Sequence, residues 1–178
     1  DDVQGGYRAA QHLLELGHRR IAFVGDPIHT AFNFTSSRDR LVGMKQSLVE
    51  HGIPFCLAYH QTGEHGQDQA RALTRQLLAL AEPPTAIFAA SDTQALGVMQ
   101  AARELGRQVP EDLSVIGFDD IEIAEYLNLT TMHQPLFESG YRGIEVLLRS
   151  MEQIDGQSVC QQLPLELALR GSTAPPPC

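Results

Sequence analysis

The stretch from Thr85 to Asp120, TAIFAASDTQALGVMQAARELGRQVPEDLSVIGFDD, decides the fold of this chain. It runs from a continuously apolar segment, through apolar residues at helical spacing and a Gly- and Pro-containing turn, to a second apolar segment. This order predicts two parallel strands joined by a helix. Polar residues follow each strand, Ser91 and Asp92 after the first and Asp119 after the second. Because ligands of open α/β sheets bind beyond the carboxyl ends of the strands, these residues are candidates for ligand contacts.

The rest of the chain repeats this alternation, with short connections and glycines or prolines at the ends of the helical patterns. Strands are predicted at residues 21–25, 55–59, 86–90, 114–118, 130–134 and 163–169, and helices at 6–16, 38–51, 67–80, 93–105, 121–126 and 137–151. The fold class is therefore α/β, with a doubly wound parallel sheet covered by helices on both faces. The rhythm breaks near residues 127–130, which is where we expect the chain to cross to another lobe.

Composition limits the partners of the chain. Its 178 residues carry a formal net charge of -9, which disfavours nucleic-acid binding by this chain itself. No apolar run approaches the roughly 20 residues that span a bilayer, so no membrane partner is expected. The three cysteines are widely spaced and odd in number, which fits reduced thiols in the cytoplasm. The chain opens on Asp1–Asp2, without an initiator Met or a signal peptide, and we expect it to be a piece of a longer protein.

Enzymatic interpretations find little support. The sequence has no G-x-S-x-G elbow, no Walker loop and no dinucleotide fingerprint, so we expect neither an enzyme nor a cofactor. His60 and His65 are five residues apart, but they stand in a Gly-rich segment without a cysteine, and a metal site there is disfavoured. Binding a small molecule without transforming it is the better hypothesis.

Six segments together resemble the LacI/GalR family of bacterial transcription regulators, in its effector-binding part. They follow the family's order and spacing and cover nearly all of the chain: GHRRIAFVGD (17–26), SSRDRLVG (36–43), PTAIFAASDTQALGVM (84–99), VPEDLSVIGFDD (109–120), LTTMHQP (129–135) and LPLELALRGST (163–173). Each segment alone would be weak evidence, and six in sequence are specific.

The resemblance implies a periplasmic-binding-protein-like fold of two lobes around a cleft. Residues 1–128 would belong to the C-terminal lobe, 129–156 would be a fragment of the N-terminal lobe, and 157–178 would return to the C-terminal lobe. It further implies a small effector, which we expect to be a sugar. It also implies a homodimer whose interface includes the segments at 94–105 and 121–126. Operator DNA would be contacted only through a helix-turn-helix that this sequence does not contain. A sugar-binding protein of a transport system is the alternative.

The family's arginine in the S-x-x-R pattern, Arg40 here, would reach into the cleft and hydrogen-bond sugar hydroxyls. Its planar fork suits vicinal hydroxyls. The alternative is a solvated arginine near the helix terminus, paired with Asp39 or another neighbour. Arg38 ranks second, because a slip in register would confuse it with Arg40.

The resemblance also gives Asp119, the first Asp of G-F-D-D, the role of accepting hydrogen bonds from the ligand. A carboxylate offers up to four lone-pair sites to hydroxyl donors. The alternative for Asp119 is a cap on the short helix that follows, a role that fits Asp120 better.

Four further residues are weaker candidates for ligand contacts. Ser91 occupies a family contact position, with Asp92 after it as the expected N-cap of the next helix. Gln134 matches a family position at the cleft, although a solvent-facing glutamine is nearly as plausible. Phe32 and Phe34 could stack on a sugar ring or pack under their loop.

Overall fold

The computed structural model of the protein describes residues 1–27, 34–152 and 159–177. In this part of the chain a single sheet has the strand order β2-β1-β3-β4-β5-β6, parallel throughout except that β6 runs antiparallel to β5. The strands are β1 (Ile21–Gly25), β2 (His60–Thr62), β3 (Ala86–Ala89), β4 (Ser114–Asp119), β5 (Thr130–His133) and β6 (Glu166–Ala168). The predicted α/β sheet is confirmed.

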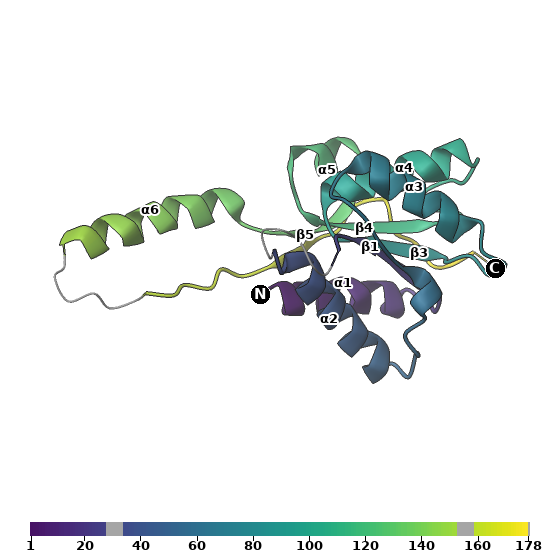
Figure 1. The fold of residues 1–178 in the computed structure, drawn as a ribbon, viewed down its shortest axis with the longest axis horizontal. Helices are drawn as coiled ribbons and strands as arrows, with labels where there is room; N and C mark the ends of the chain where they lie inside the picture. The colour runs from purple at the N-terminus through teal and green to yellow at the C-terminus, as the bar shows by residue number, and fades with distance from the viewer. Residues whose placement is uncertain (28–33, 153–158, 178) are drawn as a thin grey trace.

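Helices cover both faces of the sheet. Figure 1 shows α1 (Asp2–Glu15) and α2 (Ser36–Glu50) on one side, and α3 (Gln67–Leu78), α4 (Asp92–Glu104) and the short α5 (Glu122–Tyr126) on the other. Each face has its own apolar cluster, one around Phe88 and Phe118 and the other around Ile87 and Val115. Burial on both faces explains why the central strands are continuously apolar rather than alternating.

The second strand lies later than the sequence predicted. The apolar segment at 55–59 is not a strand: Leu57–Tyr59 forms a 3-10 turn, and β2 begins only at His60, which pairs with Phe23. Leu57 is 77% exposed, so its apolar character does not report burial in the sheet. The last strand also lies within the predicted 163–169, but it is shorter and antiparallel.

Strand β5 lies in the same sheet as β4. The predicted fragment of a second lobe, 129–156, begins with β5, but β5 pairs with β4 inside the sheet and its residues 130–132 are buried. Only α6 (Leu136–Glu152) projects away from the sheet, next to the returning segment at 159–165 (Figure 1). The ladder with β4 runs to His133, so residues 130–133 lie in the same sheet as β4, while the division of the chain into parts of two lobes stays a prediction.

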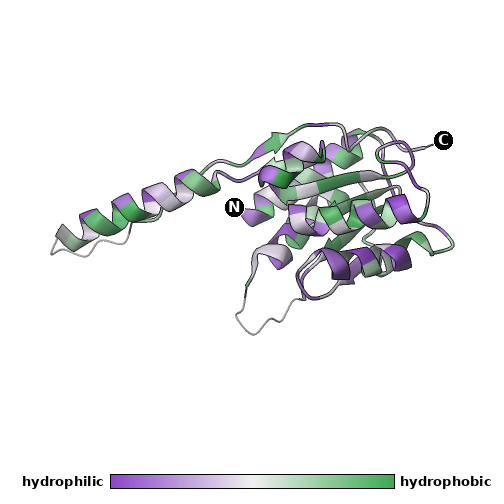
Figure 2. Ribbon diagram, turned by 90° about the horizontal axis from the view of Figure 1, so that it is seen from above, coloured by the Kyte–Doolittle hydropathy of each residue, from purple (hydrophilic) through white to green (hydrophobic). Residues whose placement is uncertain are grey.

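Helix α6 is amphipathic, and it shares a pocket with Val159 and Leu163 of the returning segment. Apolar and polar residues alternate along it in Figure 2. Its large apolar side chains are more than half exposed, which is unusual for a soluble domain: Leu136, Phe137, Tyr141, Ile144, Leu147, Leu148 and Met151. Among the described residues, no helix is long and apolar enough to cross a membrane.

Candidate functional site

Arg40 is held at the carboxyl edge of the sheet by helix packing. Helices α1 and α2 approach so closely that a Cβ on Gly6 would lie 2.0 Å from the Arg40 carbonyl oxygen. The guanidinium lies over the Phe118 ring, 3.7 Å from its centroid, and the residue is only 6% exposed. A buried cation of this kind needs partners for its donors, and it has them.

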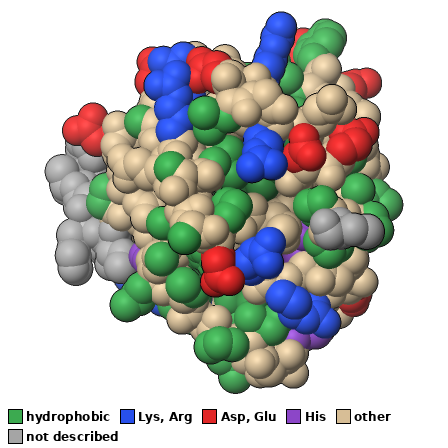
Figure 3. Space-filling model, turned by 90° about the vertical axis from the view of Figure 1, so that its right-hand side faces the viewer, with side chains coloured by type: hydrophobic (Ala, Val, Ile, Leu, Met, Phe, Trp, Pro, Cys, Tyr) green, Lys and Arg blue, Asp and Glu red, His purple; other side chains and the backbone are tan. Residues whose placement is uncertain are grey.

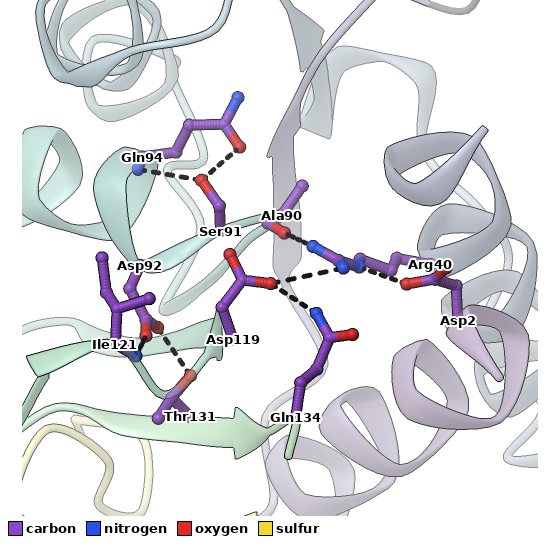
Figure 4. Close-up of polar contacts among 10 residues, drawn as sticks. All are labelled: Asp2, Arg40, Ala90, Ser91, Asp92, Gln94, Asp119, Ile121, Thr131 and Gln134. Atoms are coloured by element: carbon purple, nitrogen blue, oxygen red, sulfur yellow. Dashed lines mark hydrogen bonds and ion pairs between the residues drawn. The ribbon is translucent and has the colours of Figure 1, made fainter. Parts of the chain in front are cut away.

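Each nitrogen of the Arg40 guanidinium contacts a different acceptor (Figure 4). The Nε donates to Asp2 at 2.8 Å, one terminal nitrogen donates to the Ala90 carbonyl, and the other lies 3.3 Å from Oδ1 of Asp119. The predicted arginine and aspartate are therefore in direct contact, across the end of the sheet. The alternative of a solvated Arg40 paired with Asp39 is wrong for this residue.

Asp119 and Asp120 stand in an unusual backbone conformation. Their φ angles are +110° and +57°, a region that non-glycine residues rarely adopt and that persists only where surrounding contacts hold it. The turn that they make aims the Asp119 side chain at Arg40 and Gln134. Gln134 donates its side-chain amide to Oδ1 of Asp119 at 2.6 Å. Asp119 and Gln134, which were predicted separately as ligand contacts, thus lie at one place, where β4 and β5 end.

One oxygen of Asp119 takes all of these contacts. In Figure 4 both dashed lines from the carboxylate of Asp119 end on Oδ1, and the other oxygen carries none among the residues drawn. The side chain keeps 22% of its surface accessible. Burial raises the pKa of the Asp119 carboxyl, while the charge of Arg40 and the hydrogen bond from Gln134 lower it. A half-buried carboxylate with one committed and one open oxygen can accept a hydrogen bond from a hydroxyl.

The remaining predicted residues lie apart from this cluster or outside the described structure. Arg38 is 45% exposed and pairs with Asp39, so the interpretation first weighed for Arg40 applies to Arg38. Phe34 is 69% exposed just before α2. Phe32 falls outside the described residues.

The helix caps differ from the predicted ones. Ser91, not Asp92, is the N-cap of α4, and its hydroxyl accepts from the Gln94 amide at 3.2 Å. Asp92 begins the helix and its carboxylate is turned inward. The N-cap of α5 is Ile121, whereas Asp120 forms ion pairs on the other side of the turn. Serine and aspartate are both favourable N-cap residues, so the sequence alone could not show which of Ser91 and Asp92 caps α4.

Three residues at the same edge were not predicted as site residues. Asp26 follows β1, accepts from the side chain of Gln94 at 3.0 Å and pairs with His65 at 3.1 Å. His65 is near enough to Asp119 to lower its pKa. Asp26 ends a buried strand as Asp119 does, and the same rule about carboxyl ends could have found it.

Neither a basic surface on the face drawn in Figure 3 nor a metal-binding cluster among the described residues competes with this site. On the face drawn in Figure 3, basic, acidic and apolar side chains are mixed, without a continuous basic surface. Within the described residues, no group of three or more His, Cys, Asp or Glu side chains could hold a metal ion. The polar edge of the sheet is therefore the candidate ligand-binding site.

Comparison with known proteins agrees with this architecture. The model of the periplasmic binding protein-like domain family matches residues 10–173. The HTH-type transcriptional repressor CytR of Escherichia coli K12 is 36% identical in an alignment 178 positions long that covers 97% of this chain and 50% of that protein. The ribose operon repressor of the same organism is 38% identical over 174 residues, 97% of this chain and 52% of that protein.

A solved structure gives the same result in three dimensions. The LacI family transcriptional regulator from Enterococcus faecium with bound ribose superimposes with a TM-score of 0.89 at 34% identity, over 98% of this chain and 64% of that one. The chain spans about half the length of the curated relatives that it matches. It belongs to the periplasmic binding protein-like domain family and, with these relatives, to the LacI/GalR family of transcription regulators.

Proposed function

We propose that this chain is the effector-sensing part of a transcription regulator, and that it binds a small sugar at the carboxyl edge of its sheet. One observation carries the proposal: Arg40, Asp119 and Gln134, from three separate elements, meet where β4 and β5 end. An arginine fork and a carboxylate with an open oxygen suit the vicinal hydroxyls of a sugar. The bound ribose of the similar regulator from Enterococcus faecium supports that class of effector.

The roles within the site are unequal. Asp119 accepts from ligand hydroxyls, Arg40 fixes Asp119 and donates to the ligand when it binds, and Gln134 adds a donor or acceptor beside them. Ser91 already uses its hydroxyl as a helix cap, so it ranks below these three. Phe34 is an exposed aromatic residue just before α2, Phe32 stays a candidate from the sequence alone, and Arg38 is the least favoured.

The other half of the cleft comes from the second lobe, to which α6 belongs. The helix leaves the sheet just after Gln134, at the same edge as the site, and its apolar face lies open. Apolar surface of this extent needs a covering partner. The rest of the N-terminal lobe, in the longer protein, covers it and closes over the sugar.

Regulation works by linkage. A sugar that contacts both lobes favours one arrangement of the lobes, and a homodimer transmits it to DNA-binding domains elsewhere in the protein, as a coupling of about 1–3 kcal/mol. A groove of about 560 Å³ with an apolar part at Leu96, Met99 and Leu127 and a polar part that includes Arg103 and Glu111 is the candidate for the dimer contact. Because a regulator that binds operator DNA works inside the cell, the proposal includes a cytoplasmic location.

A sugar-binding protein of a transport system would share the fold, and an enzyme would need to transform the sugar. Neither alternative is favoured, because the matched relatives described above are regulators. Recovery of the sugar chemically unchanged after incubation with the protein would exclude an enzyme, and loss of operator binding on adding the sugar would exclude a transport role.

The test is a thermal-shift panel of sugars, beginning with D-ribose, on the full-length protein. A sugar at 100 times its Kd adds about 2.7 kcal/mol of apparent stability. Asp119→Ala should remove the shift, with a loss of roughly 100-fold in affinity. Arg38→Ala, which changes an arginine two residues from Arg40, is the matched control and should keep the shift. A full response in Asp119→Ala would refute the assignment of the site.

A further inference from the structure

We infer that Asp92 is a positioning residue for the effector site: its buried carboxylate braces the turn that carries Asp119 and the strand that leads to Gln134. This inference rests on the proposed function and deepens it. Asp92 lies behind the site and would not touch the sugar, and its action would pass through the two residues that do.

The contacts of Asp92 join three elements (Figure 4). One carboxylate oxygen accepts from the backbone amide of Ile121 at 2.9 Å, and the other accepts from the Thr131 hydroxyl at 2.6 Å. Asp92 itself begins α4 and is 0% exposed. The single side chain therefore ties the start of α4 to the end of the turn after β4 and to the middle of β5.

The sheet is shaped to admit this carboxylate. Gly117 of β4 pairs with Thr131, and a Cβ built on Gly117 would lie 2.3 Å from Oδ1 of Asp92. Any other residue at position 117 would displace the carboxylate or the strand. A glycine inside a central strand weakens the strand, and close approach of another group is a common reason for it.

The braced points flank the ligand-binding residues. Ile121 follows directly after Asp119 and Asp120, both at positive φ, so its amide hydrogen bond fixes the end of the unusual turn. Thr131 lies three residues before Gln134, on the strand that delivers the Gln134 amide to Asp119. Without the hydrogen bonds to Asp92, the turn can relax toward negative φ angles, and the carboxylate of Asp119 would no longer point at the site.

Stability alone does not explain a carboxylate at this place. Burial raises the pKa of Asp92 to about 6, with Asp119 and Asp120 adding to the rise, while the hydrogen bonds from Thr131 and Ile121 oppose it. A buried charge that two acidic neighbours disfavour is a cost to folding. Groups perturbed in this way gather at functional sites, where their geometry has a use.

The experiment compares three variants of the full-length protein by calorimetric titration with D-ribose, or with the sugar that gives the largest shift in the panel. Asp92→Ala removes both hydrogen bonds, and we expect its Kd to rise at least tenfold. Asp92→Asn can offer its oxygen to the Ile121 amide and its amide group to the Thr131 oxygen, so its Kd should stay within about threefold of the wild type. Thr131→Val removes one contact and should lie between them.

A matched control separates positioning from general destabilisation. Ser114→Ala removes a buried hydroxyl with hydrogen bonds at the opposite, amino end of β4. Its Kd should equal that of the wild type even though its unfolding temperature falls. All titrations are made where circular dichroism shows each variant folded. If Asp92→Ala does not fold, the Kd values of the other variants decide: the Kd of Thr131→Val should be higher than those of Asp92→Asn and Ser114→Ala.

A Kd unchanged in Asp92→Ala or in Thr131→Val would overturn the inference, and so would an Asn variant as weak as the Ala variant. If no sugar in the panel binds the wild type, the proposed function fails separately. A crystal structure of Asp92→Ala then decides the brace: retained positive φ at Asp119, with its contacts to Arg40 and Gln134 intact, would refute it.

Discussion

Buried polar groups lie at both ends of the same parallel strands, and the two ends differ in kind. At the amino end, His18 is fully buried and its ring contacts Thr85, Ser114 and the Ala174 carbonyl, within 3.1 Å. These partners are neutral hydroxyls and a carbonyl, and the residue before His18 that stands at positive φ is a glycine, Gly17, which adopts that conformation readily. At the carboxyl end the groups are charged, half-open and set on a turn with positive φ angles, as at Asp119.

The difference indicates that the amino-end cluster stabilises the fold and that the carboxyl-end cluster is arranged for a ligand. The amino-end cluster ties the C-terminal segment to β3 and β4, and a neutral, satisfied network of this kind rigidifies a domain. The carboxyl-end cluster concentrates carboxylates that repel one another and a strained turn, and such features persist where they serve a ligand. Substitutions at the two ends should therefore separate stability from effector binding.

Arg40→Ala should have the largest effect, because it acts on both properties. The change leaves Asp2 and Asp119 without their cation and opens space over Phe118. Removing one partner of a largely buried ion pair costs about 3–5 kcal/mol, and the partial exposure of both aspartates places this case at the lower end. Urea unfolding measures the stability, and the thermal-shift panel measures the loss of sugar binding.

Arg38→Ala is the control for that change. Arg38 is on the same helix but exposed, and its contact with Asp39 should contribute less than about 1 kcal/mol. If Arg38→Ala were as destabilising as Arg40→Ala, the distinction between a buried and a solvated arginine would be wrong.

Asp92→Asn should change how stability depends on pH. The folded-state pKa of Asp92 is raised to about 6 from 3.8, so between these values the folded chain binds more protons than the unfolded chain. Asp92 therefore stabilises the fold most in acid, and this contribution is lost as the pH rises through 6, by up to about 3 kcal/mol. The Asn variant lacks this loss, so its stability relative to the wild type should rise between pH 4 and pH 7.

Urea unfolding of both proteins across that range isolates the effect, because His18 and His60, whose pKa values burial lowers, are common to both. A constant difference in unfolding free energy from pH 4 to pH 7 would show that Asp92 is ionised in the folded protein throughout.

The sequence predicts the central strands of the sheet better than its edge strand β2. Continuous apolar runs identify β1, β3 and β4, since burial on both faces leaves a strong pattern. Arg40, Asp119 and Gln134 were found through a family resemblance, and the structure brings them into contact. The edge strand β2 was misplaced because half-exposed residues such as Tyr59 and His60 carry no clear periodicity.

The finer geometry of the site could not be read from the sequence. Whether Ser91 or Asp92 caps α4 depends on which side chain faces inward, and that depends on the space that Gly117 leaves in the neighbouring strand. Asp119 stands at positive φ, and its side chain contacts Arg40 and Gln134, which are distant in the sequence. Local residue preferences hold no information about such contacts.

Ser114→Ala should lower the stability less than Arg40→Ala does, and it should have no effect on sugar binding. Its hydroxyl contacts His18, donates to the Ala174 carbonyl and accepts from the Ala174 amide. Losing a buried hydroxyl and leaving its partners unsatisfied costs about 1–3 kcal/mol. The expected result in urea unfolding is a lower midpoint with an unchanged slope, and in titration a wild-type Kd. A weakened Kd would mean that the amino end of β4 communicates with the site, and that the two ends of the sheet are not independent.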